Sequence, residues 1–179
     1  LETLLVDREL SSELLKKIME DLVQAGVEIR TCPDTQKKLE GHSQLEMGNA
    51  SEEDWKTEHL EMVLSVKTVS GLEGAIQHIN RYGSNHTDSI VTESREAAER
   101  FMNEVDSAGV FWNASTRFAD GFRYGLGAEV GVSTCKTHAR GPVGLEGMVI
   151  YKYKLYGSGQ GAGSYSKRER EFLHQPLET

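Results

Sequence analysis

The sequence predicts an α/β fold made of parallel βαβ units, and three patterns support this prediction. Between residues 62 and 113, short apolar runs typical of strands alternate with longer segments of helical periodicity. The start of the chain has the same order, a short apolar run followed by a helix-like segment. Eleven of the 18 glycines lie in the last third, which indicates loops with unusual backbone angles there. We therefore expect a parallel layered sheet followed by a loop-rich C-terminal segment.

The first third of the chain predicts a strand, a helix and a second strand. Residues 3–6 form a short apolar run, and residues 27–30 alternate like a strand. Between them, residues 8–24 have helical periodicity, and Gly26 follows where a helix commonly ends. Residues 33–55 are polar and predict an insertion or a mobile loop. The expected inner face of the helix comprises Leu10, Leu14, Leu15, Ile18, Met19, Leu22 and Val23.

The middle of the chain is the most regular part. Residues 62–66 read as a buried strand and residues 70–82 as a helix. Residues 89–91 predict a short strand, Ser94 can cap the next helix, and residues 109–113 close the series as a strand. Strands and helices at this spacing favour parallel pairing. The inward residues of the two helices are expected to be Leu72, Ala75, Ile76, Ile79, Ala97, Ala98, Phe101, Met102 and Val105.

The last third has fewer regular patterns. Residues 113–147 contain many glycines, but their aromatic residues argue against disorder. Residues 148–156 alternate apolar and polar side chains and predict an exposed strand, which could be an edge strand of the domain. Residues 157–166 are rich in glycine and serine, and the charged tail from Lys167 is predicted to be mobile.

Composition excludes several classes of protein. The net charge of −8 argues against a nucleic-acid surface, and no apolar run approaches the length of a membrane span. The histidines show no metal-binding spacing, so no metal site is predicted. Cys32 and Cys135 are far apart, which suits the reducing cytoplasm. The chain opens in mid-pattern without an initiator methionine or a signal peptide, and we interpret it as a fragment.

The densest group of candidate binding residues is the stretch 113–118, which follows a predicted parallel strand. Ligands of open α/β sheets gather at the carboxyl ends of strands. Asn113, Ser115 and Thr116 supply short hydrogen-bonding groups, and Arg117 supplies a planar fork suited to a carboxylate or a phosphate. The alternative is a plain turn in which Arg117 pairs with a surface acid.

A second candidate is the glycine-rich stretch 121–131. The spacing of Gly125, Gly127 and Gly131 differs from the dinucleotide fingerprint, so a phosphate-cradling turn is only weakly supported. The backbone amides of such a loop can approach a small anionic ligand. A simple set of tight turns is the alternative.

These two stretches, at 111–118 and 125–131, resemble the γ-glutamyl phosphate reductase family of the aldehyde dehydrogenase superfamily. Residues 138–147 also resemble that family, and residues 75–90 match its signature stretch. The four motifs occur in the family's order. The resemblance extends over the chain except for the polar segment near 33–55 and the last dozen or so residues.

The resemblance implies an activity and a cofactor. Such enzymes use NADPH to reduce L-glutamyl 5-phosphate to L-glutamate 5-semialdehyde and phosphate in proline biosynthesis. A cysteine thiolate displaces phosphate and forms a thioester that hydride then reduces. The family's cysteine would lie three residues before Leu1, so no catalytic residue is expected in this chain, and the fragment alone is expected to be inactive. Cys32 and Cys135 do not match the nucleophile's position.

The resemblance also implies binding roles. Glu58 would hold the nicotinamide ribose of NADP, although a solvated surface carboxylate is the alternative. His86 is expected to make a structural hydrogen bond, and Arg140 either pairs with Glu146 or contacts the cofactor domain. The residues expected to hold the substrate, around its α-carboxylate end, are Asn113, Ser115, Thr116, Arg117, Gly125, Gly127 and Gly131.

The implied organisation has three parts. Residues 1–130 would be the C-terminal part of an aldehyde-dehydrogenase-type catalytic domain, and residues 131–147 would return towards the cofactor domain. Residues 148–179 would form an oligomerisation strand and a mobile tail. The expected partners are the acyl phosphate substrate, the protein's own N-terminal cofactor domain and further copies of the chain. Two alternatives remain: the reductase region of a bifunctional synthase fused behind a glutamate kinase (pyrroline-5-carboxylate synthase), and a non-catalytic oligomerisation module.

Overall fold

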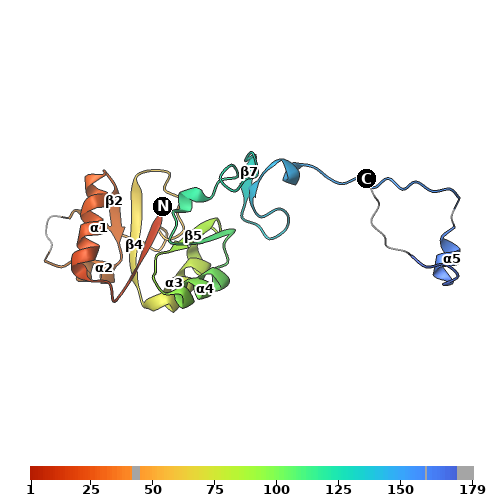
Figure 1. Cartoon of the computed structure of the whole chain (residues 1–179). Helices are drawn as coiled ribbons and strands as arrows, with labels where there is room; N and C mark the ends of the chain where they lie inside the picture. Colours follow the sequence, from red (N-terminus) through yellow and green to blue (C-terminus); the bar gives the residue numbers. More distant parts are fainter. Residues whose placement is uncertain (42–44, 160, 173–179) are drawn as a thin grey trace. The chain divides into compact units, whose positions relative to one another are not determined.

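The computed structural model describes residues 1–41, 45–159 and 161–172 (Figure 1). The chain divides into two compact units, Leu1–Met148 and Val149–Thr179, and each unit is described by itself. In the described part, no helix has both the length and the apolar composition needed to cross a membrane.

The centre of the first unit is a four-stranded parallel sheet in the order β1-β4-β2-β3. Its strands are β1 (Thr3–Asp7), β2 (Glu28–Thr31), β3 (Met47–Asn49) and β4 (Val63–Val69). All three strand pairs are parallel, with Thr3 opposite Ser65. The predicted parallel α/β sheet is therefore confirmed.

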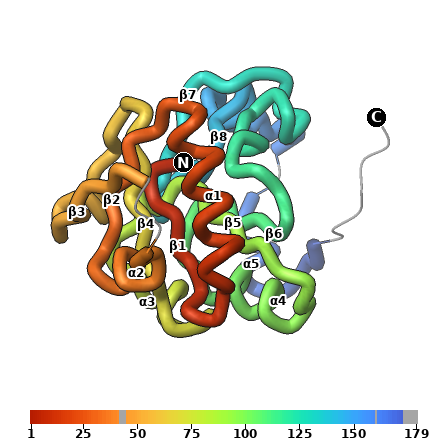
Figure 2. The backbone as a smooth tube through the Cα atoms, turned by 90° about the vertical axis from the view of Figure 1, so that its left-hand side faces the viewer, coloured from red at the N-terminus to blue at the C-terminus, as the bar shows by residue number. Residues whose placement is uncertain are grey.

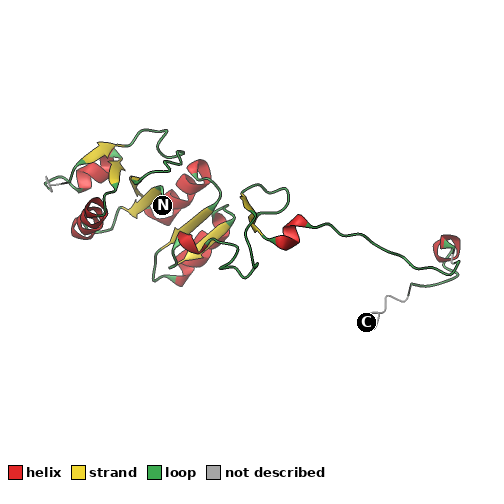
Figure 3. Cartoon of the chain, turned by 90° about the horizontal axis from the view of Figure 1, so that it is seen from above, coloured by secondary structure: helices red, strands yellow, loops and turns green. Residues whose placement is uncertain are grey.

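Helices cover both faces of this sheet. Successive side chains of β4 point to opposite faces, and each face packs against a helix. Leu64 and Val66 join the core against α1 (Ser12–Gln24), whereas Lys67 contacts His78 of α3 (Gly71–Tyr82). Figure 2 shows α1 and α2 in front of the strands, and Figure 3 shows helices on both sides of them. The core on the α1 side comprises Val6, Leu15, Met19, Ile29, Leu39, Leu64 and Val66.

The first helix begins later than its apolar periodicity predicts. Ser11 caps α1 by accepting a hydrogen bond from the backbone N–H of Leu14 at 3.2 Å, which fixes the start at Ser12. At the other end Gly26 has a φ of 84°, the left-handed conformation that ends many helices, as predicted. Leu15 is fully buried, but Leu14 is 48% exposed, so its predicted inward position is wrong.

The predicted insertion or mobile loop at residues 33–55 contains regular structure. Helix α2 (Pro33–Lys38) begins at a proline, and β3 joins the sheet beside β2. Thr35 is completely buried, and its hydroxyl accepts a hydrogen bond from the backbone N–H of Thr68 in β4 at 2.9 Å. The prediction is wrong here because polar side chains bind the sheet's own backbone, so their polarity does not indicate exposure. Residues 42–44 lie outside the described part.

The second half of the predicted series is also confirmed. β5 (Thr87–Ile90) and β6 (Gly109–Trp112) pair in parallel and are joined by α4 (Arg95–Glu104). Ser94 caps α4 through the backbone N–H of Ala97, as predicted. These strands form a sheet of their own in the described part of the chain. Its core comprises Ile76, Phe101 and Val105, with Leu72, Ile79, Ile90 and Val110 packed against them.

The rest of the chain has short elements. In the first unit, η1 (Thr116–Phe118), an antiparallel pair of β7 (Gly131–Ser133) and β8 (Gly141–Val143), and η2 (Leu145–Met148) follow β6. In the second unit, α5 (Ala162–Ser166) is a single short helix. The edge strand predicted at 148–156 is not formed within the described part of the chain, since Met148 ends η2 and no described residue pairs with 149–156; the strand between subunits stays a prediction. Alternation alone forms no strand without a partner. The predicted mobile tail lies partly in 173–179, outside the described residues.

Helix α3 has a buried histidine on the side that faces the sheet. His78 is 7% exposed and packs between the rings of Trp55 and Tyr82, with centroid distances of 5.5 and 4.7 Å. Nζ of Lys67 lies 3.3 Å from its Nδ1. Burial, together with the nearby Lys67 charge, lowers the pKa of His78 to about 4. The ring is therefore neutral at pH 7.

This histidine predicts a loss of stability in acid. Because the pKa is lower in the folded chain than in the unfolded chain, the unfolded state binds more protons between about pH 6.5 and pH 4. The stability linked to His78 is complete above pH 6.5 and is lost as the pH falls to about 4. The free energy of unfolding, measured in urea, should fall between pH 7 and pH 4.5 by roughly 2 kcal/mol more in the original chain than in His78→Phe. Equal losses in the two chains would contradict this prediction.

Candidate functional site

The loop after β6 is held to the neighbouring chain by Asn113. Its side-chain Nδ2 donates to the carbonyl of Thr92 at 2.9 Å, and its Oδ1 accepts from the N–H of the same residue at 2.9 Å. Asn113 has a φ of 51°, a left-handed conformation that asparagine tolerates better than most residues. The amide of Asn113 therefore shapes the loop, and Ser89 of β5 also holds it by donating to the carbonyl of Ala114 at 2.7 Å.

Arg117 has the one charged side chain of residues 113–118. Ser115 accepts a hydrogen bond from the backbone N–H of Arg117 at 3.2 Å and caps η1, which also contains Thr116. The Arg117 side chain is exposed and forms no ion pair within the described residues, so the predicted alternative of a surface pair is not found there. Arg123, which the sequence analysis did not select, donates from Nη1 to the carbonyl of Arg117. An unpaired guanidinium can bind a carboxylate or a phosphate with two parallel hydrogen bonds.

The glycine-rich stretch forms tight turns in front of β7. Gly125 and Gly127 have φ values of 80° and 75°, which favour glycine, whereas Gly131 has an ordinary φ and begins β7. Leu126 N–H donates to the carbonyl of Gly121 at 2.9 Å. The predicted tight turns are therefore present. The backbone N–H of Gly127 has no partner among the described residues, so it remains available to an anionic ligand.

An apolar depression lies beside the 113–118 loop. Its volume is about 340 Å³, and Phe111 and Tyr124 meet edge to face in its wall, with ring centroids 6.5 Å apart. Burial raises the pKa of the Tyr124 hydroxyl. The sequence predicted ordered aromatic residues here but not this depression. Its lining comprises Met102, Val110, Phe111, Trp112, Ala114, Phe118 and Tyr124.

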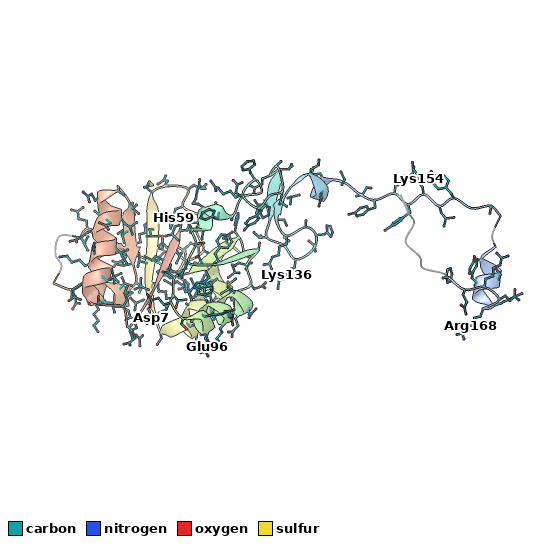
Figure 4. The ribbon with its side chains drawn as sticks, in the orientation of Figure 1. Asp7, His59, Glu96, Lys136, Lys154 and Arg168 are labelled. Atoms are coloured by element: carbon teal, nitrogen blue, oxygen red, sulfur yellow. The ribbon has the colours of Figure 1, made fainter. Side chains whose placement is uncertain are left out.

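Glu58 lies in the loop that leads into β4. Its carboxylate is exposed and has no hydrogen-bond or ion-pair partner among the described residues, so it can accept hydrogen bonds from ribose hydroxyls. Parallel pairing places Leu1 at the same end of the sheet, since Ser65 N–H donates to the carbonyl of Glu2 at 2.9 Å. Figure 4 shows His59 at that end and Asp7, which ends β1, at the other. Leu60, 85% exposed, has a φ of 56°, which is rare for leucine.

The remaining candidate residues have structural partners. Nδ1 of His86 lies 2.7 Å from Oγ1 of Thr87, which gives the structural hydrogen bond that was expected. Arg140 bonds to Asp106 and not to Glu146, which was one of its two alternatives; the other, a contact with the cofactor domain, stays a prediction. Cys32 is buried and Cys135 is exposed, and both are free thiols. No three His, Cys, Asp or Glu residues of the described part are placed to hold a metal ion.

Comparison with known proteins finds relatives that match nearly the whole chain. No protein-family model matches the chain. γ-Glutamyl phosphate reductase of Acetivibrio thermocellus is 53% identical over 176 residues, which are 98% of this chain and 39% of that protein. The corresponding protein of Methanococcoides burtonii is 48% identical over 100% of this chain and 40% of its own length. A probable γ-glutamyl phosphate reductase of Schizosaccharomyces pombe is 49% identical over 99% of this chain. The chain thus spans about two fifths of the length of these relatives.

Solved structures agree with the sequence relatives. The crystal structure of γ-glutamyl phosphate reductase from Thermotoga maritima matches with a TM-score of 0.81 and 41% identity, over 89% of this chain and 37% of that chain. Propionaldehyde dehydrogenase of Clostridium phytofermentans, 13% identical with a TM-score of 0.50, shares the fold. The chain is therefore homologous to the C-terminal part of γ-glutamyl phosphate reductase and has a fold of the aldehyde dehydrogenase type.

Proposed function

We propose that the chain is the C-terminal part of an NADPH-dependent reductase that converts L-glutamyl 5-phosphate to L-glutamate 5-semialdehyde and phosphate in proline biosynthesis. About 50% identity to several γ-glutamyl phosphate reductases supports this activity. The observation in the structure that carries it is the exposed side chain of Arg117, which has no ion-pair partner among the described residues and belongs to a loop whose Ala114 and Phe118 line an apolar depression. A charged group next to an apolar wall suits a substrate with a carboxylate at one end of an aliphatic chain.

The chain's own residues would bind and orient the reactants. Arg117 would hold the α-carboxylate of the glutamyl group, while Ser115 and Thr116 shape the turn that presents it. Asn113 would fix this turn to β5's end through Thr92. The loop containing Gly125 and Gly127 would close over the substrate and exclude water.

Residues beyond this chain would supply the reacting groups. The thiolate of the cysteine expected before Leu1 attacks the acyl carbon, a C–S bond forms, and the C–O bond to phosphate breaks. NADPH, when bound, would supply the hydride that reduces the resulting thioester carbon. Collapse of the thiohemiacetal then releases the aldehyde and regenerates the thiolate. The exposed and unpaired carboxylate of Glu58 fits a role in holding the nicotinamide ribose, and that of a simple surface acid is the alternative.

The second unit supports a subunit contact. Its first residues expose several large apolar side chains without a strand partner in the described part of the chain. We propose that this segment contacts a further copy of the protein, because single-chain proteins rarely leave such patches uncovered. The exposed residues are Val149, Ile150, Tyr151, Tyr153, Leu155 and Tyr156.

The free thiols Cys32 and Cys135 favour a reducing cytoplasmic location.

The function is tested by NADPH oxidation that depends on acyl phosphate, with the full-length protein. The original protein should turn over, and Arg117→Ala should lower kcat/KM about 10- to 100-fold, mainly by raising KM, because the carboxylate loses its partner. Arg117→Lys should recover part of the loss, since lysine keeps the charge without the planar fork.

Arg95 provides a matched control for this test. It is an exposed arginine that pairs with Glu99 on α4, and Arg95→Ala should leave both constants within about twofold. Absence of turnover by the original protein would refute the proposed function. Unchanged constants in Arg117→Ala would refute the role of that residue alone.

A further inference from the structure

We propose that Asp106 is a positioning residue that holds the segment 125–143, and with it the proposed substrate-binding loop, at the connection between α4 and β6. The effect on substrate rests on the proposed function. Asp106 lies in the short connection between α4 and β6. It joins two stretches that are far apart in the sequence, residues 75–90 and residues 138–147. Its contacts on the two sides are made by different parts of the residue.

On the helix side, Asp106 is fixed by its backbone. Its N–H donates to Oδ1 of Asn80 in α3 at 2.9 Å. The Nδ2 of the same asparagine donates to the carbonyl of Glu104 at 2.9 Å. One amide side chain thus binds the end of α4 at two points, which makes Asp106 a fixed attachment point on the core formed by Ile76, Phe101 and Val105.

On the other side, Asp106 binds two cations of the connection between β7 and β8. Nη1 of Arg140 donates to Oδ1 of Asp106 at 3.1 Å, and Nη2 donates to its backbone carbonyl at 2.9 Å. Lys136, labelled in Figure 4, forms an ion pair with Oδ2. Lys136 and, after it, Arg140 hold the pKa of Asp106 below its usual value. The carboxylate is therefore charged at neutral pH and attracts both cations.

Arg140 depends on Asp106 for its position. Its side chain is 27% exposed, and its Nε is buried without a hydrogen-bond partner among the described residues. A partly buried guanidinium depends on its remaining hydrogen bonds, and both of these go to Asp106. Neutralising the carboxylate would therefore move Arg140 towards water and release the residues next to it.

The hairpin formed by β7 and β8 (residues 131–143) connects Arg140 to the glycine-rich loop. Gly141, directly after Arg140, begins β8 and pairs with Ser133 of β7. Val130 N–H donates to the carbonyl of Val143 at 2.8 Å, which continues the pairing into the glycine-rich loop. The position of β8 therefore sets where the loop containing Gly125 and Gly127 ends. Asp106 acts on the substrate through this hairpin and does not touch the reacting atoms.

The test compares Asp106→Asn with Glu99→Gln in the full-length protein. Glu99 is also an acid, in the middle of α4, and it pairs with Arg95 one turn earlier on the exposed surface of that helix. Asp106→Asn should raise the KM for the acyl phosphate about 5- to 10-fold with kcat within about twofold, because a restraint on binding is lost. Glu99→Gln should leave both constants within about twofold. Asp106→Glu should restore most of the KM.

Hydrogen exchange separates this inference from the proposed function. Amides of residues 125–143 should exchange at least about fivefold faster in Asp106→Asn than in Glu99→Gln, while those of α1 stay unchanged. Unchanged exchange in 125–143 would overturn the positioning role, and so would a KM equal to that of the control. If the original protein had no reductase activity, the exchange experiment alone would decide the role of Asp106, and only the proposed function would fail.

Discussion

Replacing the cysteine expected three residues before Leu1 with alanine should lower the turnover of the full-length protein by at least about 10⁴-fold, because no covalent intermediate can form. The register of β1 and β4 supports its placement. Thr3 pairs with Ser65, so the chain before Leu1 emerges at the end of the sheet where Glu58 precedes β4. The expected thiol and the proposed ribose-binding carboxylate therefore belong to one end of the sheet.

Cys135 provides the control for this replacement. It is an exposed free thiol in the connection between β7 and β8, and Cys135→Ala should leave turnover within about twofold. The 179-residue chain alone should show no reductase activity in the same assay. A residue other than cysteine at that position, or full activity of the alanine variant, would contradict the covalent mechanism. Measurement of NADPH oxidation with acyl phosphate decides between these outcomes.

Much of the fold could be predicted because its signals are local. The caps Ser11 and Ser94 and the left-handed Gly26 lie next to the helices that they end, and the structure has them in these roles. Thr35 could not be found in this way. Its burial depends on Thr68, which lies 33 positions later in the chain, and local composition carries no information on such a contact. The same holds for His78, which the helix periodicity did not place in the core.

Only those features of the candidate site that depend on neighbouring residues in the sequence could be predicted. The turn around Ser115 and Arg117 follows from short polar side chains after a strand, and the structure has such a turn. Asp106 was not found, since its partners Asn80 and Arg140 become neighbours only when α4 and the hairpin have packed. The segment 148–156 pairs with no described strand of its own chain for a related reason, because strand formation needs a partner that the pattern of one segment does not specify.

The stability prediction with the largest effect concerns two adjacent leucines of α1. Leu15→Ala should lower the free energy of unfolding by about 2–5 kcal/mol, because this side chain is 0% exposed and its removal leaves a cavity. Leu14→Ala should cost less than about 1 kcal/mol, since Leu14 is 48% exposed. The two changes are chemically identical and occur in one helix, so helix propensity cancels in their difference.

Urea unfolding of the 179-residue chain, followed by circular dichroism, measures this difference. Equal losses for the two variants would show that α1 is rotated relative to the sheet, and the core of Val6, Met19 and Leu64 around Leu15 would then be wrong. The orientation of α1 matters for the site because its core partner Val6 lies in β1. That strand leads back to Leu1, so a correct helix face is a condition for placing the expected thiol beside Glu58.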